Sequence, residues 1–171
     1  MRSDTGRFVR LGLLAAMAVA LNLVESMYIG SFAYGIRIGL ANIMALITIR
    51  MLGVREMIIV NLMRVVIGSL LRGMIFGTTF WISLGGVALS SLSLILTTGL
   101  KSSLLFSSVV SSVCHSIGQV LIVVFLYHQP AMAAVLPYLL LGSVPVGLLT
   151  GYAAQRALKL VRPLETDHKK Q

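Results

Sequence analysis

Six apolar runs fill almost all of this 171-residue chain, and they constrain its fold more than any other feature. A transmembrane helix needs about 20 apolar residues, so these runs leave room for short loops and for no soluble domain. We therefore expect an all-α integral membrane protein, a bundle of six transmembrane helices forming a single domain over residues 1–171. The expected helices span about 8–25, 36–53, 56–72, 76–100, 104–127 and 131–158, and a short basic cytoplasmic tail follows at 159–171.

The composition supports a surface that faces lipid. The chain is 57% hydrophobic and 11% charged, and its mean hydropathy is +0.96, whereas a soluble domain is roughly 25% charged. The net charge of +9 could suggest nucleic-acid binding. The basic residues stand singly between apolar runs, however, which is how topology signals look. The expected surroundings are therefore a lipid bilayer and no nucleic acid.

The basic residues also predict the orientation. With six spans and the amino terminus inside, eleven of the fourteen Lys and Arg residues fall in inner loops or tails, the exceptions being Arg37, Arg64 and Arg72. This bias follows the positive-inside rule and places both termini in the cytoplasm of a bacterial-type cell. The first run imitates a signal peptide, but it continues past its small-residue cleavage sites to Val24. We expect it to stay uncleaved.

The three exceptional arginines suggest a ligand. All fall in the outer half of the membrane, where an unpaired arginine costs several kcal/mol, and Glu25 is the one acid nearby. Surplus positive charge suits a carboxylate or phosphate. The alternative is structural, with Arg37 and Arg72 as interfacial anchors and Arg64 paired to Glu25.

Polar residues inside the apolar runs are further candidates. His115 and Gln119 are one helical turn apart and share a face, and Asn42 lies in the second run beside Arg37. Polar side chains at such depth normally face the bundle interior. These three residues could line a cavity, or they could form hydrogen bonds that fix helix packing. His115 has no second ligand at metal-binding spacing, so we expect no metal site.

A stripe of small residues runs along the first helix. Gly12, Ala16 and Ala20 recur at every fourth position, which lets another helix approach closely. Such stripes serve either packing inside the bundle or docking of a partner.

The sequence contains few residues that could act as catalytic groups. The chain has five acidic residues, no GxxxxGK[ST] phosphate loop and no aspartate pair for magnesium diphosphate. We expect no catalytic residues, no cofactor and no enzymatic activity.

Three segments carry a family resemblance. They are Gly35–Ile43, Arg64–Gly73 and His115–Gln119. They resemble the Gx transporter family, often labelled heptaprenyl diphosphate synthase component I, which is similar to the substrate-binding S components of energy-coupling factor (ECF) transporters. The resemblance covers about Val9 to Ala157. Prenyl diphosphate synthases need aspartate-rich motifs, and this chain has two aspartates, both near its ends.

The resemblance implies an importer subunit. S components are six-helix bundles that bind a vitamin-like ligand near the outer surface and dock, through small residues of the first helix, on a membrane coupling subunit driven by two ATPases. That docking face would comprise Gly12, Ala16 and Ala20.

We accordingly predict an outward-opening cavity that holds an anionic micronutrient or an isoprenoid precursor. It would be lined by Glu25, Arg37, Asn42, Arg64, His115 and Gln119, with Arg37 and Arg64 binding the anionic group. Two alternatives stay open: a non-catalytic membrane partner of heptaprenyl diphosphate synthase or of quinone biosynthesis, and a stand-alone small transporter.

Overall fold

The computed structural model describes residues 2–28 and 39–167, with side chains described over 5–27 and 39–160. Over these ranges the chain is built of α-helices joined by turns, and no β-strand occurs in them. The helices are α1 (Arg2–Tyr28), α2 (Asn42–Met51), α3 (Val54–Leu71), α4 (Thr78–Gly99), α5 (Leu104–Leu126) and α6 (Leu136–Asp167), with a short 3₁₀ helix, η1 (Pro130–Val135), before α6. The expected all-α bundle is confirmed.

Four segments of the described chain are long and apolar enough to cross a membrane: Thr5–Met27, Thr78–Gly99, Leu104–Leu126 and Pro130–Leu160. They belong to α1, α4, α5 and the η1–α6 unit, so the chain is a membrane protein. Helix α3 is not among these segments, because it carries three charged residues, Arg55, Glu56 and Arg64, in 18 residues. Helix α2 has only ten residues, about 15 Å at 1.5 Å per residue.

Helix α2 is shorter than the second apolar run suggested, since it begins at Asn42 and the expected start was near residue 36. Gly39 has φ +91°, a conformation that glycine adopts without steric cost, and Gly39 to Ala41 form a turn before the helix. Helix α6 departs in the other direction and continues to Asp167. Polar residues propagate a helix almost as well as apolar ones, so the end of the apolar run did not mark the end of α6.

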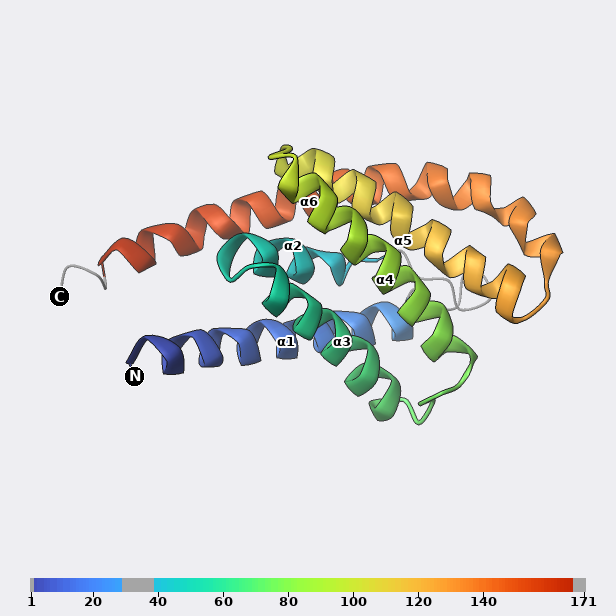
Figure 1. Cartoon of the computed structure of the whole chain (residues 1–171), viewed down its shortest axis with the longest axis horizontal. Helices are drawn as coiled ribbons and strands as arrows, with labels where there is room; N and C mark the ends of the chain where they lie inside the picture. The colour runs from blue at the N-terminus through green and yellow to red at the C-terminus, as the bar shows by residue number, and fades with distance from the viewer. Residues whose placement is uncertain (1, 29–38, 168–171) are drawn as a thin grey trace.

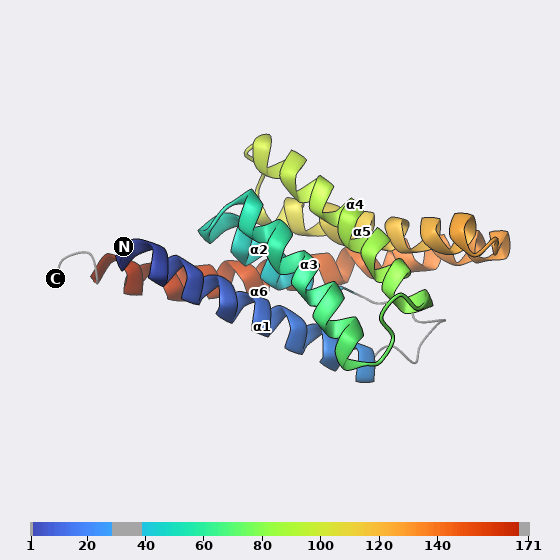
Figure 2. The same ribbon diagram turned by 60° about the horizontal axis from the view of Figure 1, so that its bottom comes forward.

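The short helix α2 lies at the centre of the bundle. It contacts α1, α3, α5 and α6, while α4 packs mainly on α5, and α5 in turn on α6. Figures 1 and 2 show α5 and α6 side by side, with the start of α1 and the end of α6 at the same end of the molecule.

Glycines set the close approach of α4 to α5. A Cβ placed on Gly118 would collide with the backbone of Gly85 and lie 3.0 Å from Cα of Gly86. On the other side of α5, a Cβ on Gly147 of α6 would lie 2.7 Å from Cα of Val109. Gly147 therefore allows α6 to pack closely on α5.

The buried interior has an apolar part and a polar part. The main apolar core surrounds the second half of α2 and includes Leu46, Met57 and Leu94. A smaller apolar cluster joins α3 and α4 through Val65, Phe80 and Val87. Buried polar side chains gather instead around the first residue of α2, so this helix start positions the candidate site.

Candidate functional site

The chain segment before α2 holds the carboxylate of Glu25. Glu25, near the end of α1, is 1% exposed, and its Oε1 accepts a hydrogen bond from the backbone N–H of Gly39. A Cβ on Gly39 would lie 3.1 Å from Nδ2 of Asn42 and 3.5 Å from Cδ2 of His115. The glycine thus serves both the left-handed turn and the close approach of α1, α2 and α5.

Arg64 is the largest side chain that is almost fully buried in the described part of the chain, with 1% exposure. Its Nη2 donates a 2.8 Å hydrogen bond to Oδ1 of Asn42. Its Nε and Nη1 have no hydrogen-bond partner among the described residues. An unmet hydrogen bond of a buried charged group costs on the order of 1–3 kcal/mol or more, so this guanidinium has two donors ready for a ligand.

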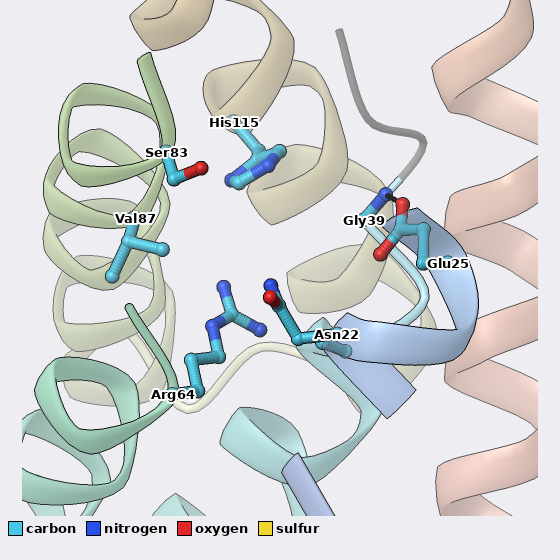
Figure 3. A pocket seen from close by; sticks show the side chains of 8 residues that line it. Asn22, Glu25, Gly39, Arg64, Ser83, Val87 and His115 are labelled. Carbon is cyan, nitrogen blue, oxygen red and sulfur yellow. Dashed lines mark hydrogen bonds between the residues drawn. The ribbon is translucent and has the colours of Figure 1, made fainter. Parts of the chain in front are cut away.

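Glu25 and Arg64 line the same cavity without forming a direct salt bridge. Among the described residues the one ion pair within 4 Å joins Arg7 to Glu56. The suggestion that Arg64 pairs with Glu25 is therefore wrong in its direct form. In Figure 3 the guanidinium of Arg64 points into the space below His115, while the carboxylate of Glu25 turns aside toward Gly39. The two opposite charges face one cavity from different helices.

His115 and Gln119 form the side of the site contributed by α5. Nε2 of His115 and Nε2 of Gln119 are 3.1 Å apart and hydrogen-bonded, and both side chains are buried. Gly86 of α4 makes room for them, because a Cβ there would lie 2.8 Å from Cε1 of His115 and from Cγ of Gln119. The glycine pair of α4 therefore shapes the site as well as the packing.

Together these residues enclose a small polar cavity (Figure 3). Its free space is about 10 Å³, close to the minimum that one water molecule needs. The lining side chains and backbone come from α1, the turn before α2, α3, α4 and α5: Asn22, Glu25, Gly39, Ala41, Arg64, Ser83, Val87 and His115. The cavity thus has room for about one water molecule.

The predicted site residues fall into three groups. Glu25, Arg64 and His115 line the cavity, and Asn42 and Gln119 support two of these residues by hydrogen bonds. Arg37 lies outside the described residues.

Arg72 is not part of the cavity lining. It donates hydrogen bonds to O of Gly68 at 2.7 Å and to Oγ of Ser26 at 3.3 Å, and so ties the ends of α1 and α3 together.

Sequence reasoning missed Ser83 and Val87 of α4, which complete the lining. A serine or a valine in an apolar helix is ordinary, so neither residue stood out. The Gly85–Gly86 pair was the available clue, since it marks where another helix approaches α4.

Chemically, the site can bind but lacks the groups for metal chemistry. Over the described residues, no group of three His, Cys, Asp or Glu side chains could hold a metal ion. One guanidinium with free donors, a carboxylate, an imidazole and amides are suited to hydrogen-bonding a small polar group.

The small-residue stripe of α1 lies on the outside. Gly12, Ala16 and Ala20 are all exposed, and a Cβ on Gly12 would meet nothing within 4 Å. Helix α1 packs inward through other residues, among them Ala15 and Ala18. The stripe therefore does not serve packing inside the bundle.

Comparison with known proteins gives one match. A family model described as heptaprenyl diphosphate synthase component I matches residues 14–157, a range that includes the whole cavity. No curated protein and no solved structure matches the chain.

Proposed function

Because the chain belongs to the heptaprenyl diphosphate synthase component I family, we propose that it is a membrane subunit that binds a small anionic ligand and hands it to an importer. In this role it is the S component of an ECF-type transporter. It resides in the cell membrane with both termini in the cytoplasm, and it catalyses no reaction.

The observation that carries this proposal is the state of Arg64. A guanidinium 1% exposed, with Nε and Nη1 unpartnered in the described structure, faces a cavity inside a membrane protein. Arginine presents parallel N–H donors that match carboxylate and phosphate oxygens. Binding an anion there would satisfy both donors and offset a buried charge that the bundle holds at a cost.

The rest of the site fits a binding role. The carboxylate of Glu25 is engaged by the backbone of Gly39, which leaves the guanidinium of Arg64 available. His115, held by Gln119, presents a ring to the opposite side of the cavity and would orient the ligand. A cavity with room for about one water must open before a ligand enters, as expected for a protein that releases its cargo by changing shape.

The exposed stripe of small residues on α1 supports the proposal that the protein is part of an importer. Gly12, Ala16 and Ala20 form a smooth surface that faces away from the bundle. In a membrane, small residues let helices of two subunits approach and gain dispersion contacts. The coupling subunit, driven by two ATPases, is the partner we propose for this surface.

The family description favours a second function, a non-catalytic membrane partner of heptaprenyl diphosphate synthase. It shares the anion site, because a diphosphate would also suit Arg64. It differs in its protein partners.

Affinity purification in mild detergent, with mass spectrometry of bound proteins and metabolites, separates the two functions. We expect a membrane coupling subunit, two ATPases and an anionic metabolite that the double variant Glu25→Gln/Arg64→Met fails to retain. Recovery of a soluble prenyl synthase without ATPases would overturn the importer proposal in favour of the second function.

A further inference from the structure

A second, larger opening, a groove between α3 and α4, lies on the side of the helix bundle. Its volume is about 330 Å³, at the lower end of the 300–1,000 Å³ typical of small-molecule sites. Its walls are apolar apart from Asn61 and Ser91, which are hydrogen-bonded to each other at 2.8 Å. At its rim Leu62 is 47% exposed and Leu92 53% exposed, so this groove opens toward the lipid.

The groove and the polar cavity share one wall. Val87 lines both, from the middle of α4. On α3, Asn61 lines the groove and Arg64 the cavity, three residues apart and so less than one helical turn. Val87 therefore lies between the cavity of the unsatisfied Arg64 guanidinium and an apolar groove that opens toward the bilayer.

Resting on the function proposed above, we infer that the ligand is an anionic amphiphile with a single hydrocarbon tail. Arg64 binds its head group, the α3–α4 groove holds its tail, and Val87 is the side chain that moves when the two spaces join. The ligand enters sideways from the membrane.

The direction of the groove agrees with this arrangement. The groove is lined from Leu84 to Ile95 on α4 and from Ile58 to Leu62 on α3. Its longer part lies beyond Val87 and Asn61, about 12 Å along α4 to Ile95 and about 4.5 Å along α3 back to Ile58. Both paths lead away from the helix ends that lie near Glu25. A head group at Arg64 would thus have its tail pointing along the bundle toward the end that carries the chain termini.

The seam between α3 and α4 is also the place where a tail can be accommodated. Helix α4 packs tightly on α5 through glycine contacts and much less extensively on α3. Widening the α3–α4 interface therefore breaks fewer contacts than opening the α4–α5 or the α5–α6 interface.

The test uses the full chain in phosphatidylcholine nanodiscs and four probes: decyl phosphate and decanoate, with methyl phosphate and acetate as tail-free counterparts. Empty nanodiscs correct for partition into lipid. Ala88, exposed at the groove, is changed to Phe to fill it. The matched control is Leu96→Phe, at an exposed position of α4 outside the groove.

We expect Ala88→Phe to weaken binding of a ten-carbon probe about tenfold or more, equivalent to 1.4 kcal/mol. Leu96→Phe should leave binding of that probe unchanged. If Ala88→Phe binds the ten-carbon probes as the wild type does, the tail does not occupy the groove and the inference fails, whereas the anion site stands as long as the folded double variant Glu25→Gln/Arg64→Met binds all probes more weakly. If the double variant binds every probe as the wild type does, the proposed anion site itself fails.

Discussion

Arg64 and Glu25 are two buried charges of opposite sign that face one cavity without touching. Removing one of such a pair leaves the other uncompensated and costs about 3–5 kcal/mol, whereas replacing both by neutral residues is often neutral or stabilising. We predict that Arg64→Met alone lowers the free energy of unfolding by several kcal/mol. The double variant Glu25→Gln/Arg64→Met should lie within about 1 kcal/mol of the wild type.

Thermal unfolding in detergent measures this difference, and binding of methyl phosphate or acetate measures function. The double variant should be folded and unable to bind either anion. If it unfolds as readily as the single variant, Arg64 holds the bundle together through its bond to Asn42, and its role is structural.

Removing the charge of Glu25 alone should strengthen anion binding, whereas removing Arg64 should abolish it. Glu25→Gln keeps an oxygen that accepts the N–H of Gly39 and removes the negative charge. A carboxylate beside the cavity repels an anion by on the order of 1–2 kcal/mol at an effective dielectric constant near 20. We therefore expect the variant to bind methyl phosphate or acetate about tenfold more tightly. Weaker binding would mean that the Glu25 carboxylate itself contacts the ligand.

The sequence identifies the charged members of this site and not its neutral ones. Arg64, Glu25 and His115 stand out because ionisable groups within apolar runs must turn inward, and all three line the cavity. Ser83 and Val87 do not stand out, because their position depends on how α4 crosses α3 and α5. The lack of a direct Arg64–Glu25 bond was equally hidden, since it depends on the turn at Gly39 that binds the carboxylate.

The α4–α5 pair depends on a glycine contact that can be tested directly. A methyl group on Gly118 would strike the backbone of Gly85, which cannot rotate away as a side chain can. We predict that Gly118→Ala destabilises the bundle by about 1–3 kcal/mol, as overpacking does. It should also disturb His115 and Gln119, which lie on the same helix.

Gly142 of α6 is the matched control. It is exposed, and a Cβ there meets nothing within 4 Å, so Gly142→Ala should leave stability unchanged or raise it by up to about 1 kcal/mol. Midpoints of thermal unfolding in detergent give both values. Equal effects of the two substitutions would show that the α4–α5 contact is not tight.

Apolar runs located the helices well and their ends less well. Each of the six α-helices falls on one run, because length and hydropathy decide whether a segment can span lipid. The start of α2 was not predictable, since the residues from 36 to 41 are as apolar as the helix that follows them. The positive φ of Gly39 and its close approach to Asn42 and His115 belong to the folded chain, and hydropathy does not record them.

The outer face of α1 is where the proposed assembly can be tested on the intact protein. Gly12 and Gly142 are both exposed glycines in apolar helices, and neither has a neighbour within 4 Å of a built Cβ. A leucine at either position should leave folding and anion binding unchanged. Only Gly12→Leu would place a bulky side chain between α1 and a docked helix, because Gly12 belongs to the small-residue stripe with Ala16 and Ala20.

We therefore predict that Gly12→Leu lowers recovery of the coupling subunit and ATPases about tenfold or more, a loss of at least 1.4 kcal/mol of docking free energy. Gly142→Leu should retain wild-type recovery. Quantitative mass spectrometry of the two purified variants, normalised to the bait, gives the ratio. Equal recovery from both variants would move the docking surface off α1. A loss of anion binding in Gly12→Leu would instead show that α1 couples the outer surface to Glu25 and the cavity.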